Sequence, residues 1–511
     1  MPDNSRHACS NEGISSSPTQ PFSRACVVLA GTLLLYFTAC ILMLPGSMVL
    51  PMMLLPGLPF LFFFMPDPRR WFLLLPLAIA LGYTEISLGP FPLLLAVAFL
   101  FFGYLVYFLA KTASYSPAPP FGVFSRLLLF AYLAQMTSLF VSIHVNGQHV
   151  LNAVRESHKF FIPALLPLII LDWYGEKGWF DRMLKAFVLT LLVLSVYGVY
   201  QFHSGSAWSV GEVASGYQIA GRAFSTIRGG ANSYSGFLEL TVPATLAAAF
   251  YFKEKRWKIL CFTAVVLGML NGLYTYSRGG FLTISLSSIL YLIYRFRRKV
   301  WVPVLSVSVF VGIVTANAET FDRQLVLLTN PSRVVFEATL LHRYVSYSRY
   351  IMDIKTNPIT GVGWGAKEFY SGGSNLYSFW EVRHEQSTEH IRNFGGLNSL
   401  FFDMVLKGGI ASALSLLLII ALAVYASLKA LRYRCESDLA VGFVSGLAAF
   451  GAHQIVDNLL QWPQTGSFFW ISLGMLAVLG REHTVKPYNT RVDHENENDC
   501  GAETPSGLLR E

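Results

Sequence analysis

The chain has 511 residues, of which 53% are hydrophobic and only 13% are charged, and its mean hydropathy is +0.48. A soluble domain carries roughly 25% charged residues, so the composition excludes a typical soluble enzyme and predicts a protein that spans a membrane. The net charge of +8 does not indicate a nucleic-acid partner, because the Lys and Arg residues lie in short loops beside apolar runs, where positive charge sets membrane orientation.

Apolar runs of membrane-spanning length follow one another between a polar tail over 1–25 and another over 482–511. Crossing a hydrocarbon core takes roughly 20 helical residues, and a segment in lipid must satisfy its own backbone hydrogen bonds, which predicts helices. The expected fold class is an all-α polytopic membrane protein with about 12–14 transmembrane helices. The expected spans cover residues 26–44, 47–65, 71–84, 92–110, 122–144, 158–172, 186–203, 233–252, 259–276, 280–294, 300–316, 398–427, 440–459 and 464–480.

Clusters of Lys and Arg predict the orientation of these spans. They lie at 253–258, 295–299 and 429–434, with weaker ones at 69–70 and 177–185. When all of them face the cytoplasm, the spans alternate without contradiction and both termini lie inside. The expected regions are a cytoplasmic tail (1–25), an N-terminal bundle (26–203), a core membrane segment (204–316), a large external loop (317–396), a C-terminal membrane segment (397–481) and a second cytoplasmic tail (482–511).

Two external segments, 204–232 and 317–396, are long enough to carry function. The second is about as polar as a small soluble domain, and a polar insertion of this length among short loops is more often functional than idle. None of the cysteines lies in a predicted external loop, and no Cys/His spacing suits a metal, so we expect neither a disulfide framework nor a metal or other cofactor.

Five ionisable residues fall in or near the expected spans, all toward the external side. Each is costly in lipid unless it is paired or hydrated, which makes it a candidate functional residue. Glu239 lies about two turns into its helix, whereas Asp403 and Lys407 are four residues apart and can pair on one helix face. His453 and Asp457 repeat that spacing. Their common depth predicts a water-accessible cavity open to the outer leaflet, and the alternative is that they only hold helices together.

Arginines form a second group on the predicted external side. The group consists of Arg222, Arg228, Arg278, Arg343 and Arg349, the last two in an expected amphipathic helix of the large loop. A guanidinium presents a planar fork of donors that matches phosphate oxygens. These arginines therefore either contact anionic lipid headgroups or converge on a pyrophosphate.

Four segments, in the same order and spacing, resemble motifs of the O-antigen ligase and polymerase superfamily. GRAFSTIRGGANSYSGFLELTVPATLAA (221–248) resembles its Arg followed by a Gly/Asn-rich turn and a span, and YTYSRGGFLTISLSSILYLI (274–293) resembles its Ser-Arg-Gly motif. RYVSYSRYIMDIKTNPITGVGWGAKEF (343–369) is similar to its loop helix and Asn-Pro-hydrophobic-x-Gly-hydrophobic-Gly turn. GLNSLFFDMVLKGGIASALSLLLII (396–420) is similar to the segment that re-enters the membrane after the loop.

The resemblance implies a metal-independent, inverting glycosyltransferase of the multi-spanning class, located in the bacterial inner membrane with a periplasmic active site. The implied donor is an undecaprenyl-diphosphate-linked glycan. The implied acceptor is another glycan, lipid A–core or a protein side chain, which places the protein in lipopolysaccharide or exopolysaccharide biosynthesis. The resemblance also implies that Arg222 and Arg278 bind the donor diphosphate, with Arg343 or Arg349 assisting from the loop.

The acceptor side departs from the family pattern. Family ligases carry a His immediately before the Asn or Ser that starts the re-entering span, and here that position is Leu397, followed by Asn398. Because leucine cannot take a proton, the expected base is His384, Glu385 or His390 upstream, or Asp403 one turn inside the span. Otherwise the chain is not a ligase of the usual kind. Asn398 is a further candidate catalytic residue.

The main alternative is a transporter or flippase of lipid-linked glycan or polysaccharide. Such proteins usually carry internal repeats and place charged or broken-helix sites near the midplane. The sequence contains no convincing repeat, and no group of ionisable residues comparable to the five on the external side lies in the inner half of the spans. A catalytically inactive assembly factor is a third possibility, although full retention of the arginines is unexpected in such a protein.

Overall fold

All regular elements of the described chain are helices, as the composition predicts. The structure, a computed structural model, describes residues 72–81, 123–149, 153, 156–157, 163–175, 177–204, 222–227, 230–299, 301–316, 347, 350–351, 353–364, 399–432 and 437–481. The expected spans 26–44, 47–65 and 92–110 lie outside the described residues, as does most of the loop 317–396.

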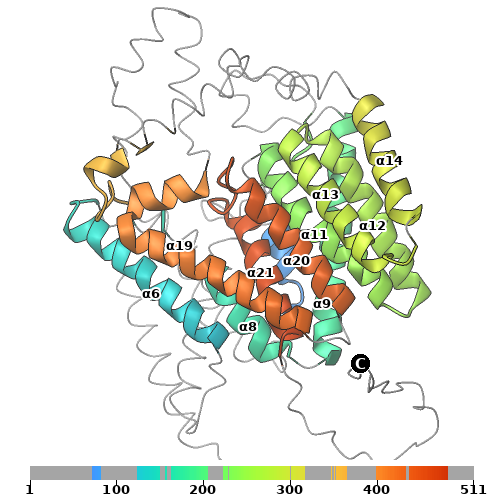
Figure 1. Ribbon diagram of the computed structural model, residues 1–511, viewed down its shortest axis with the longest axis horizontal. Coiled ribbons are helices and arrows are strands. Elements are labelled where there is room, and N and C mark those ends of the chain that lie inside the picture. The colour runs from blue at the N-terminus through green and yellow to red at the C-terminus, as the bar shows by residue number, and fades with distance from the viewer. Residues whose placement is uncertain are drawn as a thin grey trace, which may run out of the picture. The chain divides into compact units, whose positions relative to one another are not determined.

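The described helices belong to one compact unit that extends to Gly480 (Figure 1). In chain order they are α4 (Leu75–Leu81), α6 (Val123–His144), η2 (Pro163–Leu165), α8 (Leu166–Trp173), α9 (Lys177–Ser204), α11 (Gly230–Tyr251), α12 (Lys255–Tyr274), α13 (Arg278–Arg295), α14 (Trp301–Ala316), α19 (Leu400–Arg432), α20 (Ser437–His453) and α21 (Pro463–Leu479). Most of them coincide with expected spans to within a few residues.

Four of these helices are long enough and apolar enough to cross a membrane. They are α6, residues Gly178–Ser204 of α9, α12 and α19. Large apolar side chains lie on their outer faces, among them Phe140, Val266 and Leu417, each at least 60% exposed. Continuous apolar surface of this kind is rare on soluble monomers and fits a lipid environment.

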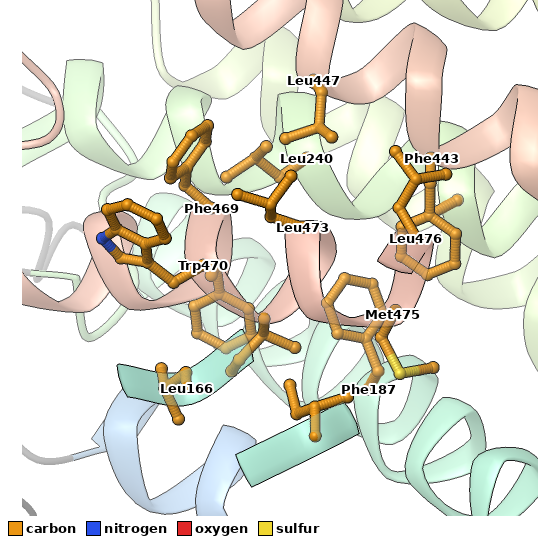
Figure 2. Packing of buried hydrophobic residues seen from close by; sticks show 14 of the residues in the cluster. Leu166, Phe187, Leu240, Phe443, Leu447, Phe469, Trp470, Leu473, Met475 and Leu476 are labelled. Atoms are coloured by element: carbon orange, nitrogen blue, oxygen red, sulfur yellow. The ribbon is translucent and has the colours of Figure 1, made fainter. Parts of the chain in front are cut away.

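Helices α21 and α11 form the centre of the packing. Every residue of α21 is buried, as are most residues of α11. Figure 2 shows Leu473 and Leu476 of α21 packed among Leu240 of α11, Phe443 of α20 and Phe187 of α9. A helix that is apolar around its whole circumference needs neighbours on every side, and α21 contacts α8, α11, α19 and α20.

Glycines allow α20 to approach α11 closely. A Cβ atom at Gly442 would overlap the side chain of Ala247, and one at Gly446 would lie 2.9 Å from the carbonyl oxygen of Glu239. Small residues at a helix interface in lipid gain van der Waals contact by letting the backbones come together. This contact runs along both helices and brings the last residue of α20, His453, beside Glu239 of α11.

The contact between α11 and α13 depends on Gly280 in the same way. A methyl group at this position would overlap the side chain of Ser235. We expect Gly280→Ala to lower the free energy of unfolding by about 1–3 kcal/mol, as extra methyl groups do in packed interiors. Thermal unfolding of the purified protein in detergent measures this change.

Gly279→Ala is the matched control for that prediction, because it makes the same change one residue earlier. A Cβ atom at Gly279 would have no neighbour closer than 3.6 Å, so we expect no loss of stability there. Equal stability of both variants would show that α11 and α13 are farther apart than the structure places them.

Basic residues of three described clusters, around 185, 256 and 295, lie at one end of the bundle. Arg295 at the end of α13 pairs with Asp438 in the first turn of α20 at 3.2 Å. Lys185 of α9 pairs with Glu254 before α12, also at 3.2 Å. Hydrogen bonds from Arg256 and Lys185 hold the pKa of the Glu254 carboxyl below its ordinary value. The last residue of α20 and the first residue of α13 therefore lie at the opposite end.

Helix α19 is interrupted at Gly409, a break that the expected continuous span 398–427 does not include. Gly409 has φ 59° and ψ −149°, which is not a helical conformation. The N–H of Ile410 donates to the carbonyl of Ile359 (3.1 Å) instead of to the carbonyl of Leu406, which accepts from Val362 (2.8 Å). The loop turn 357–364 thus replaces the hydrogen bonds that α19 loses, which is how a broken helix stays satisfied in an apolar environment.

The same turn is fixed on its other side by α6. Trp364 is fully buried, and its Nε1 donates to Ser138 Oγ at 2.9 Å. Asn146 Nδ2 lies 3.2 Å from the carbonyl oxygens of both Thr360 and Gly361. The turn that carries the Asn-Pro-hydrophobic-x-Gly-hydrophobic-Gly motif therefore packs between α6 and α19.

The expected span 440–459 is wrong at its C-terminal end, because α20 ends at His453. Gln454 Oε1 accepts hydrogen bonds from the backbone N–H groups of Leu459 (3.1 Å) and Leu460 (3.4 Å). A buried side chain that binds backbone donors offers the chain an alternative to the helix. Residues 454–462 consequently form an irregular connection to α21, and this connection carries two polar residues of the site.

Candidate functional site

A connected group of polar side chains surrounds the connection between α20 and α21. We call it the polar cluster, and its members are Glu156, Arg222, Asn232, Glu239, Thr283, Asp403, Lys407, His453, Asp457 and Asn458. They come from α11, α13, α19, the end of α20, the α20–α21 connection, the segment before α11 that contains Arg222, and a helical turn before η2 that contains Glu156. The cluster has three branches.

The first branch is a buried carboxylate–imidazole pair. Glu239 Oε1 lies 2.6 Å from His453 Nδ1, and the hydroxyl of Thr283 donates to the same oxygen at 2.7 Å. Glu239 is 0% exposed and His453 is 4% exposed. Buried charges persist only when they are paired and hydrogen-bonded. Because Glu239, Thr283 and His453 belong to α11, α13 and α20, this one oxygen joins three helices.

The second branch links Arg222 to the α20–α21 connection. Arg222 Nη2 donates to Asn232 Oδ1 at 3.2 Å, and Asn232 Nδ2 donates to Asp457 Oδ2 at 2.8 Å. The other side of the guanidinium is fixed as well, since Arg222 Nε donates to the carbonyl of Thr275 at 2.8 Å. Thr275 lies in the turn immediately before α13, so Arg222 is bound to the start of that helix.

The start of α13 brings Arg222 and Arg278 into one region. Arg278 is the first residue of the helix, after the N-cap Ser277, and Gly279 follows it on the exposed surface. The first turn of an α-helix directs N–H groups outward and carries a partial positive charge, which favours anions. Two arginines and a helix N-terminus together form a site suited to a phosphate-containing group.

Unusual backbone conformations accompany both arginines. Ser225 and Tyr276 are the non-glycine residues with positive φ among the residues described, at 52° and 48°. Ser225 is held there by hydrogen bonds, because its N–H donates to Gln201 Oε1 (2.8 Å) and its hydroxyl donates to the carbonyl of Leu194 (2.9 Å). Strained conformations that the surroundings enforce are concentrated at functional sites, which strengthens the case for this region.

The third branch is an ion-pair network on α19. Lys407 Nζ lies 2.9 Å from Asp403 Oδ1 and 3.5 Å from Glu156 Oε2. Asn458 Nδ2 donates to Asp403 Oδ2 at 2.7 Å. Asp403 is 0% exposed, and its ammonium and amide partners occupy both of its oxygens. Asp457 and Asn458 are neighbours in the chain, so the second and third branches meet at the α20–α21 connection.

Of the candidate residues that the family resemblance suggests, the structure describes three, which are Arg222, Arg278 and Asp403. Arg222 is bound to the carbonyl of Thr275, three residues before Arg278, the first residue of α13, and whether the two bind one ligand stays a prediction. Asp403 is buried and paired with Lys407, as the spacing of four residues predicts. The others lie outside the described residues, namely Arg228, Arg343, Arg349, His384, Glu385, His390 and Asn398.

His453 and Asp457 do not pair in the way that their spacing suggests. Helix α20 ends at His453, so Asp457 is not one turn further along a helix face. The side chain of His453 contacts Glu239, and that of Asp457 contacts Asn232. A backbone bond from the N–H of Asp457 to the carbonyl of His453 (2.9 Å) still keeps the two residues close.

Sequence reasoning missed the neutral members of the polar cluster. Asn232, Thr283 and Asn458 carry no charge, and an uncharged polar residue in a span gives little signal by itself. Asn232 was detectable only as part of the Gly/Asn-rich segment that follows Arg222. Glu239 and His453 stood out as ionisable residues in apolar segments, but nothing local showed that they are partners.

The cluster offers two kinds of chemistry. The arginines and the start of α13 supply fixed positive charge, and the Glu239–His453 pair supplies an imidazole held by a carboxylate. Among the residues described, no group of three or more His, Cys, Asp or Glu side chains is placed to hold a metal ion.

No protein-family model matches the chain, and no curated protein matches it.

Proposed function

We propose that the protein transfers a glycan from a polyprenyl-diphosphate donor, of the undecaprenyl type, to an acceptor at the periplasmic face of the bacterial inner membrane. In this proposal it is a surface polysaccharide polymerase or an O-antigen ligase. The observation that carries the proposal is the hydrogen bond from Arg222 to the turn before α13, which places Arg222 at the helix that begins with Arg278.

The charge of the site suits the leaving group of such a transfer. A sugar leaves its carrier when the bond between its anomeric carbon and the diphosphate oxygen breaks, and negative charge then develops on the diphosphate. Preorganised positive groups placed where this charge develops are an effective form of catalysis. Arg222 is preorganised by bonds on both sides of its guanidinium, to Thr275 and to Asn232.

The arrangement of the helices is consistent with a lipid-linked donor at the outer leaflet. The site lies at the end of the bundle opposite the Lys and Arg clusters, which we assign to the cytoplasm by the positive-inside rule. Apolar outer faces on α6, α12 and α19 let a polyprenyl chain stay in lipid while its diphosphate reaches the site. In this topology both termini are cytoplasmic, and the acceptor is another glycan, lipid A–core or a protein.

One observation favours transport as the second candidate function. A buried ionisable pair such as Glu239 and His453 is typical of proton pathways in transporters. A flippase would move the lipid-linked glycan across the membrane without breaking the sugar–diphosphate bond. The location of the lipid-linked glycan in cells therefore separates the two functions.

The test is a strain that lacks the protein, complemented with the wild type or with Arg278→Ala. We expect the variant to make surface glycan about 100-fold more slowly, a loss of the size seen when one stabilising donor is removed from an active site. Accumulation of single lipid-linked repeats would identify a polymerase. Accumulation of long lipid-linked chains with a bare acceptor would identify a ligase.

Arg256→Ala is the matched control, because Arg256 is an exposed arginine at the opposite end of the bundle, bound to Glu254 at 2.8 Å. We expect wild-type glycan from this variant. Normal glycan from Arg278→Ala would refute the diphosphate site. Accumulation of lipid-linked glycan on the cytoplasmic leaflet would instead show that the protein is a flippase.

A further inference from the structure

The imidazole of His453 is held by a contact between its Nδ1 atom and Glu239. Its Nδ1 lies 2.6 Å from Glu239 Oε1, which also accepts the Thr283 hydroxyl at 2.7 Å. When Glu239 is ionised, its oxygen accepts a hydrogen bond from Nδ1–H, and the lone pair of the neutral ring then lies on Nε2. This is the arrangement in which a buried carboxylate prepares a histidine to accept a proton.

The Nε2 atom lies beside the proposed diphosphate site. It would be 3.6 Å from a Cβ atom at Gly279, the residue that follows Arg278 in the first turn of α13. Gly279 is exposed and carries no side chain. The lone pair of His453 and the arginine at the start of α13 thus meet at the same turn.

We propose that His453 is the general base of the transfer and that Glu239 is its positioning residue, which rests on the proposed function. His453 Nε2 takes the proton of the acceptor hydroxyl. The acceptor oxygen forms the new bond to the anomeric carbon, and the bond from that carbon to the diphosphate oxygen breaks. The diphosphate leaves with the electron pair, and Glu239 stabilises the imidazolium across the 2.6 Å contact.

The geometry disfavours the described alternative, Asp403. Its two carboxylate oxygens face Lys407 Nζ (2.9 Å) and Asn458 Nδ2 (2.7 Å), so accepting a proton would break a buried ion pair. His453 accepts a proton while its contact with Glu239 is strengthened by the new charge. In this proposal His453 accepts the proton, which Leu397, at the position of the family histidine, cannot do.

The test uses the full-length protein in liposomes, with the lipid-linked glycan extracted from a strain that lacks it as donor. We expect His453→Gln to lower kcat by about 100- to 1,000-fold, the usual contribution of a general base. Binding of undecaprenyl diphosphate should stay within about two-fold of wild type, because the base does not contact the diphosphate. His144→Gln is the matched control, since His144 is also the last residue of its helix but is exposed.

Gly279→Ala tests the position of Nε2 without changing the histidine. The added methyl group would contact Nε2 at an ordinary van der Waals distance, so the protein should fold normally while access to the lone pair is reduced. We expect a loss of kcat of at least ten-fold with unchanged binding of undecaprenyl diphosphate. Wild-type kcat in this variant would overturn the assignment of Nε2 as the proton acceptor.

Glu239→Gln tests the positioning role through the split between kcat and KM. We expect a lower kcat at unchanged KM for the donor, and no further loss when it is combined with His453→Gln, because residues that act as a unit are not additive. A purely structural role would add to the histidine effect. The two proposals fail in different ways: no transfer by the wild type refutes the transferase, whereas transfer at the wild-type rate by His453→Gln refutes only the base.

Discussion

Replacing Gly409 by alanine is expected to lower the free energy of unfolding by about 3–5 kcal/mol. Two costs add. The backbone at φ 59° and ψ −149° is essentially restricted to glycine. In addition, a Cβ atom would overlap the carbonyl oxygen of Ile359 in the turn that fills the helix break.

The measurement is unfolding of the purified protein in mixed micelles, titrated with a denaturing detergent. Gly312→Ala is the matched control, because a Cβ atom there would have no neighbour within 4 Å and lies within helix α14. Gly361→Ala should reproduce the Gly409 effect, since its Cβ atom would lie 2.6 Å from the N atom of Gly409. If Gly409→Ala unfolds like the wild type, the loop turn is not inserted at α19.

Lys407→Met is expected to cost about 3–5 kcal/mol of stability, because it leaves a buried carboxylate without its cation. Asp403 is 0% exposed and would keep only the amide of Asn458 as a partner. The branches of the polar cluster meet at Asn458, so the loss of this pair should also disturb the connection that carries Asp457. We therefore expect glycan transfer to fall together with stability.

Removing both charges separates this explanation from a simple packing defect. The double variant Asp403→Asn/Lys407→Met should recover most of the lost stability, since neither buried charge remains. Lys185→Met breaks the exposed ion pair with Glu254 and should change stability by at most about 1 kcal/mol. Equal losses in the single and double variants would mean that the Lys407 side chain stabilises the fold by packing alone.

The loop turn and the site are linked by this same pair. Gly363 donates its N–H to the carbonyl of Lys407 at 3.0 Å, and the Lys407 ammonium lies 5.6 Å from the centre of the Trp364 ring. Asp403 of the pair is bound to Asn458. The turn 357–364 of the large loop and the α20–α21 connection therefore contact the same buried ion pair.

Much of the helix arrangement follows from local sequence. The expected spans 122–144 and 464–480 agree closely with α6 and α21, because hydropathy and the need to satisfy backbone groups act within each segment. The Asp403–Lys407 pair also followed from spacing alone, since residues four apart share a helix face. These features depend on a few neighbouring residues and on the solvent around them.

The pairing of distant polar groups did not follow from the sequence. Glu239 and His453 are 214 positions apart, and only the close approach of α20 to α11 through Gly442 and Gly446 brings them to 2.6 Å. The break at Gly409 could not be predicted from the sequence either, because a Lys-Gly-Gly sequence inside an apolar run is compatible with a continuous helix. It is the turn at 357–364 that makes the break stable by replacing its lost hydrogen bonds.

By itself, then, the sequence determined that this protein is a bundle of apolar helices with polar residues concentrated toward one side. Burial in lipid is decided segment by segment, since each residue contributes its own transfer free energy. The tertiary structure alone decided which polar residues become partners. A buried charge is tolerated only at a specific contact between helix ends, and such contacts depend on the packing of all the helices together.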